Sequence, residues 1–309
     1  VVDPLIEKES SSANAINKSA TIKFKVTDKY FKASTLTKDN IKVFINGTET
    51  TSGLTKTLLG SNLMDSNVQY GVDYTFTVTG FATNIHQVKI VIPKGLITDN
   101  SGNGNKETTF LLYNTLKATY TGTYSTANES SSTAGFLGNT SIQRQNIDNV
   151  TFTNSISGAN STKWDVSARG DSSILAWYTK NSNGSLKVYI GSDSEIFANQ
   201  NSSDLFAFIG YADKCTSTQT ITNLNLLNVA SVTNMYRMFR YTGSKSMNKL
   251  DLGSNFNTSN VTNMSAMFEE TGHTAMTTLN LGANFNTNKV TTMEYMFKLC
   301  GYTKMTSLS

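Results

Sequence analysis

Short stretches in which apolar and polar residues alternate run through the first third of the chain. In SATIKFKVTD, the side chains of Ile22, Phe24 and Val26 share one face of an extended chain. Such alternation is typical of a half-buried β-strand. NIKVFINGTET alternates in the same way and then reaches Asn46-Gly47, a pair that readily forms a tight hairpin turn. We expect a β-sandwich of about one hundred residues, with further strands in DYTFTVTG, HQVKIVIPKGLITD and ETTFLLYN.

The middle of the chain is β-rich and less regular. It starts with TGTYSTANESSSTAGFLGNTS, whose composition is typical of a loop or a linker. Three strands are predicted after it, in TKWDVSA, SSILAWYTK and SLKVYIG. Trp164 and Trp177 lie in two of these strands, and either they pack in the core or they form a flat platform for a carbohydrate. The pattern leaves both possibilities open.

An internal repeat occupies the last third of the chain. The string VTNMYRMF at 232–239 returns as VTNMSAMF at 261–268 and as VTTMEYMF at 290–297, with a spacing of 29 residues both times. A leucine pair precedes each string, as at Leu250 and Leu252, and a glycine follows each one. An internal period of this length is typical of proteins built from stacked repeats.

Each repeat is predicted to contain one strand and one helix. The two leucines of an L-x-L pair lie on the same face of a strand. On a helix that turns about 100° per residue, Val261, Met264, Met267 and Phe268 form one apolar stripe, and the glycine at 272 ends it. One unit has no core of its own, so we expect neighbouring units to stack into a continuous solenoid with the stripe as its core.

The repeat resembles a known family. NVTNMSAMF and the preceding FNTSN resemble the BspA-like leucine-rich repeats of bacterial surface proteins, with their string N-V-T-x-M-x-x-M-F after an F-x-T segment. The first copy departs from it, because Ala230-Ser231 precedes the valine and the F-x-T segment is absent. WDVSARGDSSILAWY and SLKVYIGSDSEIFANQNSSDLF resemble the lead-in to such repeats. VTDKYFKASTLTKDNIKVFING and IPKGLITDNSGNGNKETTF resemble bacterial immunoglobulin-like domains.

Together these resemblances imply a mainly β, multidomain protein. We expect an immunoglobulin-like β-sandwich over 1–115, a β-rich lead-in unit over 116–219, and an α/β leucine-rich-repeat solenoid with 29-residue repeats over 220–309. The last residues, MTSLS, repeat the start of a unit, so we expect the natural protein to continue. The chain begins without Met, which is expected of a processed protein or of a piece of a longer one.

Composition narrows the functional classes. Ser, Thr and Asn account for 113 of the 309 residues, whereas charged residues are 16% against a usual fraction of about 25%. Neutral hydroxyls and amides therefore solvate the surface. The net charge of +4, from 26 basic and 22 acidic residues, is too small for a nucleic-acid footprint. No stretch approaches the roughly 18 consecutive apolar residues that a membrane span needs, so we expect no membrane insertion.

Residues that carry catalysis or bind metals are scarce. Cys215 and Cys300 are 85 positions apart, which matches neither a disulfide framework nor a zinc motif. His86 and His273 are the two histidines, and neither has a partner at a motif distance. We therefore expect no enzyme activity, no catalytic residues, no metal site and no cofactor.

Two weaker patterns lie in the first region. The run DNSGNGN at 99–105 faintly resembles a calcium loop but lacks the later acidic ligand, so we interpret it as a turn. Immunoglobulin-like domains of Gram-positive surfaces sometimes carry an internal Lys-Asn bond. Lys23 or Lys25 with Asn103 or Asn105 would be the residues here, and such a bond lowers the intact mass by about 17 Da. An ordinary hairpin without this bond is the favoured interpretation.

The resemblance and the composition together predict a monomeric, non-catalytic protein at the surface of a Gram-positive-like cell. It would act as an adhesin that binds a host or environmental protein or glycan through the repeats. The residues between the leucines, Asn225, Asp251 and Asn280, are expected to face outward and to contact that partner. Two alternatives stay open. One is a carbohydrate-binding accessory region of a larger secreted enzyme, with its site in the lead-in unit, and the other is a structural spacer.

Overall fold

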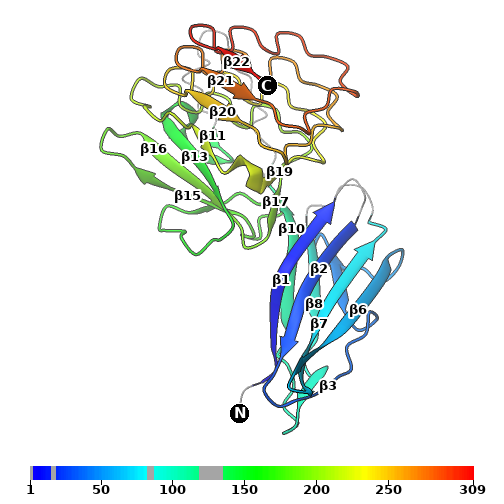
Figure 1. The fold of residues 1–309 in the computed structure, drawn as a ribbon. Coiled ribbons are helices and arrows are strands. Elements are labelled where there is room, and N and C mark those ends of the chain that lie inside the picture. The colour runs from blue at the N-terminus through cyan, green and yellow to red at the C-terminus, as the bar shows by residue number, and fades with distance from the viewer. Residues whose placement is uncertain (1–2, 15–18, 82–86, 118–134) are drawn as a thin grey trace. The chain divides into compact units, whose positions relative to one another are not determined.

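The computed structural model describes residues 3–14, 19–81, 87–117 and 135–309 (Figure 1). His86 lies outside these residues. The chain folds as two compact units, 1–114 and 115–309. Strands arranged in several sheets dominate both, so the predicted mainly β fold is confirmed. Helical structure in the described residues consists of two 3-10 segments, η2 (Arg144–Asn146) and η3 (Leu224–Leu226).

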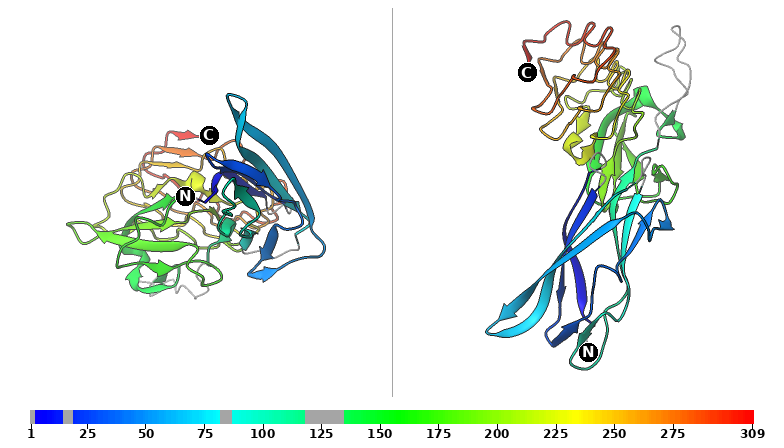
Figure 2. Two further views of the ribbon diagram at one scale, coloured as in Figure 1. Left: turned by 90° about the horizontal axis from the view of Figure 1, so that it is seen from below. Right: turned by 90° about the vertical axis from the view of Figure 1, so that its right-hand side faces the viewer.

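The first unit has two main antiparallel layers. The first layer follows the order β1 (Leu5–Asn14), β2 (Ser19–Thr27), β7 (Val68–Thr79), β6 (Thr55–Asp65). The second follows the order β10 (Thr108–Thr115), β8 (Gln87–Ile92), β4 (Lys42–Ile45), β5 (Thr48–Glu49). A small separate pair contains β3 (Phe31–Ser34) and β9 (Ile97–Asp99). Strands β6 and β7 extend as a long twisted hairpin (Figure 2).

Alternation correctly predicted the buried face of the first unit. Ile22, Phe24 and Val26 of β2 are fully buried, and the Phe24 ring lies 5.7 Å from the ring of Phe110 in the other layer. Asn46 and Gly47 adopt φ angles of 50° and 83° and connect β4 to β5. The predicted hairpin is therefore confirmed, with the left-handed angles that a tight turn between twisted strands requires.

The second unit begins with a mixed sheet and continues into short parallel strands. The sheet follows the order β14 (Trp164–Asp165), β15 (Leu175–Lys180), β16 (Leu186–Gly191), β13 (Ile147–Thr153), β18 (Ile221–Thr222). Two smaller pairs are β11 (Gly135–Phe136) with β12 (Asn139–Gln143), and β17 (Glu195–Phe197) with β19 (Leu227–Asn228). The last strands are parallel neighbours, β20 (Lys249–Asp251), β21 (Thr278–Asn280) and β22 (Ser307–Leu308).

Successive repeats lie side by side with equivalent residues in contact. Leu279 pairs with Leu250 on one side and with Leu308 on the other, each 29 positions away. Thr277 makes the same connection through its Oγ1, which donates to the carbonyl of Asn248 at 3.1 Å. The chain forms adjacent irregular loops here, coloured yellow to red in Figure 2. In the two complete copies the first leucine of each L-x-L pair lies in a short strand, Leu250 in β20 and Leu279 in β21, and the second leucine follows the strand. The first pair, Leu224–Leu226, is the 3-10 segment η3.

The structure contains one further copy that the sequence pattern did not reveal. A row of parallel bridges joins Asn201, Asn234, Asn263 and Thr292. Asn201 therefore belongs to an earlier unit, NSSDLFAFIG, which lacks the M-x-x-M-F string and lies 33 positions before its equivalent. A phenylalanine five residues after each bridge, starting with Phe206, forms a ladder in which successive rings stack at 5.4 Å. The sequence signal for this earlier copy was a phenylalanine and a glycine at the same distances from the bridge residue as in the later copies.

The helix predicted over 261–268 is wrong. This segment runs into consecutive turns, with Ala266 and Glu270 at left-handed φ angles of 53° and 54°. The amides of Met264, Ala266, Phe268 and Glu270 donate across to carbonyls of the next repeat at 2.8–2.9 Å. Amides between them close turns within the repeat, as Met267 does onto the carbonyl of Met264. The described residues hold no α-helix, so the α/β character predicted for the repeats is also wrong.

The spacing of the apolar residues was misleading because it shows which side chains are buried. It does not show which carbonyls the backbone amides bond to. A chain of four-residue turns brings Val261, Met264, Met267 and Phe268 to one side, as a helix would, and all four are fully buried. The core prediction for this stripe is therefore confirmed in the second copy. In the last copy Met293 and Phe297 are 47% and 39% exposed, since a repeat packs against only one side of them in the structure.

Candidate functional site

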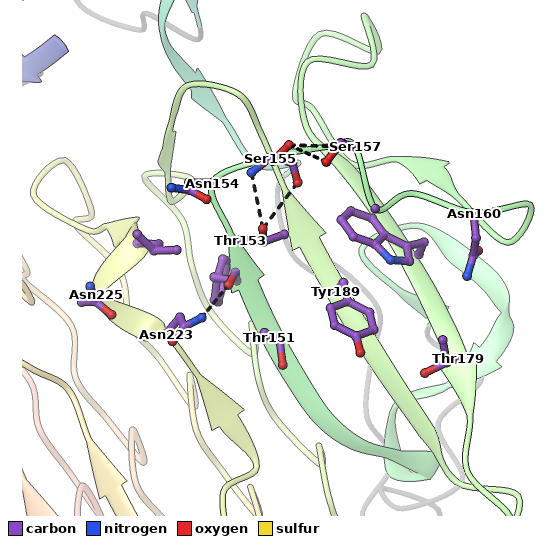
Figure 3. A pocket seen from close by; sticks show the side chains of 14 residues that line it. Thr151, Thr153, Asn154, Ser155, Ser157, Asn160, Thr179, Tyr189, Asn223 and Asn225 are labelled. Atoms are coloured by element: carbon purple, nitrogen blue, oxygen red, sulfur yellow. Dashed lines mark hydrogen bonds between the residues drawn. The ribbon is translucent and has the colours of Figure 1, made fainter. Parts of the chain in front are cut away.

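A concave surface lies on the sheet formed by β13, β15 and β16. Alternation along β13 buries Val150 and Phe152 in the core and turns Thr151 and Thr153 to the opposite face. The same alternation in β16 exposes one side of Tyr189 between two buried residues. These side chains line an open groove of about 780 Å³ on the outer face (Figure 3). Its volume is within the range of about 300–1,000 Å³ common to ligand sites.

Two stacked aromatic rings occupy one side of the groove. Trp177 of β15 and Tyr189 of β16 are direct cross-strand neighbours, and their rings stack with centroids 5.5 Å apart and planes 10° apart. Trp177 is only 5% exposed. Gly191 lies against its edge, because a Cβ added there would come within 3.0 Å of the indole Cη2. The indole therefore holds the phenol ring of Tyr189 in place.

A chain of hydrogen bonds shapes the rim of the groove. The Ser155 amide donates to Thr153 Oγ1 at 3.4 Å, and the Ser157 amide donates to Ser155 Oγ at 3.1 Å. The Ser155 hydroxyl donates to the Ser157 hydroxyl at 3.0 Å, and Figure 3 marks this contact with a dashed line. On the other side, the Asn223 side chain donates to the carbonyl of Phe152 at 3.0 Å. These bonds fix the loop after β13 and the residue that precedes η3.

Other polar groups in the groove have no hydrogen-bond partner among the described residues. Within the described part of the chain, the side chains of Asn154, Thr179 and Asn225 and the hydroxyl of Tyr189 make no hydrogen bond. All fourteen lining residues are uncharged. Outside the lining, the ammonium of Lys187 lies 5.2 Å from the centroid of the Tyr189 ring. The groove therefore offers hydroxyls, amides and an aromatic ring to a ligand.

The residues predicted to contact a partner continue from this groove along the repeats. Asn225 lines its end, and a Cβ added at the adjacent Gly253 would lie 3.9 Å from the Asn225 Cβ. Asp251 and Asn280 are paired in register on β20 and β21, and the Asn280 amide donates to the Asp251 carboxylate at 3.0 Å. We call the groove and these three residues the polar face.

Asp251 keeps its negative charge on this face. Hydrogen bonding from Lys249, whose ammonium lies 2.9 Å away, is the main reason that the pKa of Asp251 is lowered. The Gly253 amide and the Asn280 side chain donate to the same carboxylate at 3.0 Å and act in the same direction. The carboxylate therefore stays ionised at neutral pH with its hydrogen-bonding geometry fixed.

The two tryptophans have different environments. Trp164 is half-buried, packs against the core of the second unit, and donates its indole N–H to the carbonyl of Leu137 at 3.3 Å. Trp177 lines the groove although little of its surface is exposed. Sequence reasoning missed Tyr189, the more exposed ring of the pair. The alternation of Lys187 and Tyr189 with buried residues in SLKVYIG was the available signal.

The described residues bring no cluster of metal-binding side chains together. His273 stacks on the ring of Tyr302 at 5.4 Å. No three His, Cys, Asp or Glu side chains of the described chain are grouped so that they could hold a metal ion. The described chain also lacks a helix with the length and apolar character that a bilayer span needs.

Both cysteines are free thiols inside the second unit. Burial raises the pKa of Cys215 and of Cys300 to about 12. The Sγ of Cys215 also donates to the carbonyl of Gln145 at 3.3 Å. Since the thiolate is the reactive form, both residues are chemically protected in the folded protein.

We expect a thiol-specific reagent at pH 8 to leave the native protein almost unlabelled and to modify both cysteines in denaturant. The reason is that a thiol with a pKa of about 12 is protonated at that pH and is also inaccessible. Mass spectrometry over time measures the labelling, and Cys215→Ser and Cys300→Ser variants assign it. Rapid native labelling of either residue would contradict its burial.

Polar residues singled out in the first unit organise turns. Asn105 accepts the amides of Leu96 and Ile97 at 2.9–3.0 Å, and Asp99 accepts the amide and the side chain of Asn103 at 2.8 and 2.7 Å. The side-chain bond from Asn103 is the main cause of the lowered pKa of Asp99. Among the lysines proposed for a cross-link, Lys25 pairs with Glu9 and Lys23 is exposed. The structure thus gives both asparagines other partners, and Lys25 as well.

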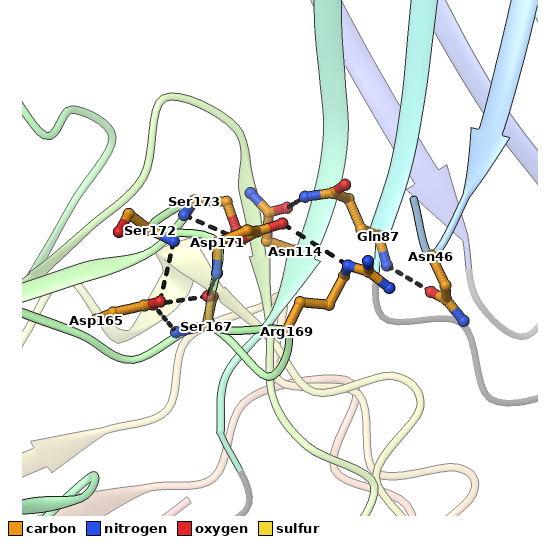
Figure 4. A network of polar contacts seen from close by, with 9 residues as sticks. All are labelled: Asn46, Gln87, Asn114, Asp165, Ser167, Arg169, Asp171, Ser172 and Ser173. Atoms are coloured by element: carbon orange, nitrogen blue, oxygen red, sulfur yellow. Dashed lines mark hydrogen bonds and ion pairs between the residues drawn. The ribbon is translucent and has the colours of Figure 1, made fainter. Parts of the chain in front are cut away.

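Further polar networks have local structural roles (Figure 4). In the first unit, Gln87 donates its side chain to Asn114 at 3.2 Å and its amide to the Asn46 side chain at 3.1 Å. In the second unit, the Asp165 carboxylate accepts the amides of Ser167 and Ser172 at 2.8 and 3.0 Å. These bonds close loops and strand ends, so neither network is a candidate site.

Comparison with known proteins gives one match. The chain is a mainly β protein of several sheets with a polar, uncharged groove. The family model described as "Mycoplasma protein of unknown function, DUF285" matches residues 210–306, about a third of the chain. This range contains the three copies of the repeat string. No curated protein and no solved structure matches.

Proposed function

We propose that this chain is a non-catalytic protein of a bacterial cell surface that binds a host or environmental macromolecule. The observation that carries the proposal is the polar face, in which a shaped groove continues into exposed polar side chains at repeat spacing. Polar groups presented at repeat spacing suit an extended partner, because several weak contacts then act together. The scarcity of charge favours recognition by hydrogen bonding.

The architecture proposed for this protein is an immunoglobulin-like stalk followed by a leucine-rich-repeat solenoid. Two packed antiparallel layers support the first assignment, together with the resemblance of its sequence to bacterial immunoglobulin-like domains. Parallel pairing at 29-residue spacing and a phenylalanine ladder support the second. The solenoid proposed here is made of strands and turns rather than strands and α-helices.

The row of Asn225, Asp251 and Asn280 is the proposed contact surface for a macromolecule. Asn225 and Asp251 are exposed and Asn280 is half-buried. Their side chains come from consecutive repeats, and two of them are already linked by a hydrogen bond. A fixed carboxylate beside amides offers a partner both acceptors and donors.

Replacing Asn225, Asp251 and Asn280 together with alanine is expected to reduce binding to host matrix proteins or to whole cells by at least about tenfold, since bonded polar contacts are lost. Surface plasmon resonance and cell-adhesion assays measure the effect. The matched control replaces three exposed polar residues of the second and third copies of the repeat, Asn255, Asn288 and Thr303, and is expected to bind normally.

Two checks keep this test decisive. Asp251 and Asn280 also accept the amides of Gly253 and Gly282, so thermal unfolding must show that the triple variant is folded. Asp251→Asn retains an acceptor for that amide while removing the charge, and it is expected to weaken binding without loss of the fold. Unchanged binding by folded variants would place the contact elsewhere.

A further inference from the structure

We propose that the groove over β13, β15 and β16 is a binding site for a neutral oligosaccharide, with the ring of Tyr189 stacking on a sugar ring. The inference rests on the proposed binding function and assigns a ligand class and a position to it. It stands on the stacked pair of aromatic rings, the uncharged lining, and the unpaired hydroxyls and amides around them. The aromatic pair itself lies on β15 and β16, outside the repeats.

The aromatic pair provides a rigid apolar surface in a polar groove. The C–H faces of a pyranose are apolar, and they pack on flat rings while the hydroxyls at the ring edge stay available for hydrogen bonds. Tyr189 is half-buried, so part of its ring faces the groove. Trp177 stacks on it and is itself wedged by Gly191 and by Gly158, where an added Cβ would lie 3.4 Å from the indole. The platform is therefore fixed before a ligand arrives.

The lining favours a ligand without charge. Every lining residue is neutral, so neither an acidic nor a basic ligand would find a charged partner in the groove itself. The free groups of Asn154, Thr179 and Tyr189 can each donate and accept hydrogen bonds. A sugar hydroxyl also does both. A neutral oligosaccharide therefore satisfies these groups, and it pairs with them without the cost of burying an unpaired charge.

Order within the groove lowers the entropic cost of binding. The bonds that join Thr153, Ser155 and Ser157 hold the rim loop, and the bond from Asn223 to Phe152 holds the other wall. Preformed walls reduce the ordering penalty that flexible loops would impose. The groove is open and reaches Asn225 at its far end. This shape suits several linked sugars rather than a single enclosed one.

The chain contains two tryptophans, and this makes a direct measurement possible. In a Trp164→Phe background, the remaining indole fluorescence comes from Trp177 beneath the platform. We expect at least one short neutral oligosaccharide, among those built from glucose, mannose, galactose or N-acetylglucosamine, to shift this emission saturably. Sialylated and sulfated oligosaccharides serve as charged comparisons and are expected to bind at least about tenfold more weakly.

Variants locate the site. Tyr189→Ala is expected to weaken binding of that oligosaccharide about tenfold through loss of stacking, whereas Tyr189→Phe keeps the ring and most of the affinity. Thr179→Ala is expected to weaken binding a few-fold because a free hydroxyl is lost. Isothermal titration measures all three variants, and unfolding temperatures confirm that they are folded. Equal affinity of folded Tyr189→Ala and the parent protein would overturn the assignment of the groove.

The design separates this inference from the function on which it rests. An Asp251→Asn, Asn280→Ala variant leaves the groove lining intact, so it is expected to bind the oligosaccharide normally while losing macromolecular adhesion. If adhesion depends on those two residues and no neutral oligosaccharide shifts the Trp177 emission, the glycan inference fails and the proposed function stands. Binding of charged oligosaccharides alone would also overturn the inference, because it would show that Lys187 dominates recognition.

Discussion

Replacing Phe268 with alanine is expected to lower the free energy of unfolding of the second unit by about 3 to 5 kcal/mol. Phe268 is fully buried. Its ring stacks between those of Phe239 and Phe297, both at 5.4 Å and nearly parallel. Removal of the ring deletes two stacking contacts and leaves a cavity in a continuous core, which neighbours on two sides would have to fill.

The matched control is Phe297→Ala in the last repeat. Phe297 occupies the equivalent position, but it is 39% exposed and the ring of Phe268 is its stacking neighbour. We expect a loss of about 1 kcal/mol there, since less apolar surface leaves water on folding. Both tryptophans lie in the second unit, so their fluorescence in a urea titration reports its unfolding. If both variants lost the same free energy of unfolding, that result would contradict a phenylalanine ladder in which Phe268 is buried and Phe297 is partly exposed.

A second large effect is expected from Gly272→Ala. Gly272 has a φ of 56°, and a Cβ added there would lie 2.4 Å from the Cβ of Met276. The left-handed angle costs an alanine about 1–2 kcal/mol, and the overlap adds about 1–3 kcal/mol of strain. The unfolding free energy should therefore fall by about 2–5 kcal/mol, as measured by denaturant or thermal unfolding. The equivalent Gly243 and Gly301 have the same overlap with Met247 and Met305.

Gly184→Ala separates the two causes. Gly184 has a φ of 77° in the turn before β16, and nothing lies within 4 Å of an added Cβ. Its replacement should show the cost of the left-handed angle alone, about 1–2 kcal/mol. If Gly272→Ala were no worse than this control, Met276 would have to move aside without penalty. That outcome would contradict close packing between the glycine turn and the methionine.

Much of the β-structure could be predicted because it follows from local rules. Alternation in SATIKFKVTD identified the buried face of β2, and Asn46-Gly47 identified a hairpin by its backbone preference. The repeat period predicted which residues would become neighbours, and Leu250 and Leu279 are paired as the period requires. These inferences depend on side-chain burial and on turn chemistry, and both leave a clear pattern in a sequence.

The conformation between the repeat strands could not be obtained in this way. Val261, Met264, Met267 and Phe268 have a spacing that suits a helix and a series of turns equally well. The choice is made by the amides, which bond to the next repeat instead of to a carbonyl four residues earlier. A bond to a residue 28 positions away leaves no local pattern. Alternation also cannot show that Asn225 would close the end of a groove formed by β13, β15 and β16.

The candidate site was predicted in pieces. The residues between the leucines do come together, because Asp251 and Asn280 share a register and Asn225 adjoins them through Gly253. Trp177 was named as a possible platform, but its partner Tyr189 was not. Cross-strand pairing, which brings these two rings into contact, depends on the register of two strands. That register is fixed only when the whole sheet has formed.

Along each repeat the backbone amides alternate between partners in the next repeat and partners in their own repeat. This alternation restricts how the length of the protein can vary. From Met264 to Glu270, every second amide bonds to the next repeat, and the residues between them close turns inside their own. Insertion of one residue into this run would exchange the amides that bond to the next repeat with those that close turns. Each later amide would then face the wrong partner. Insertion of a whole 29-residue repeat leaves the alternation in phase. Length variants of this chain should therefore differ by complete repeats, while single-residue insertions should be confined to the loops outside these runs.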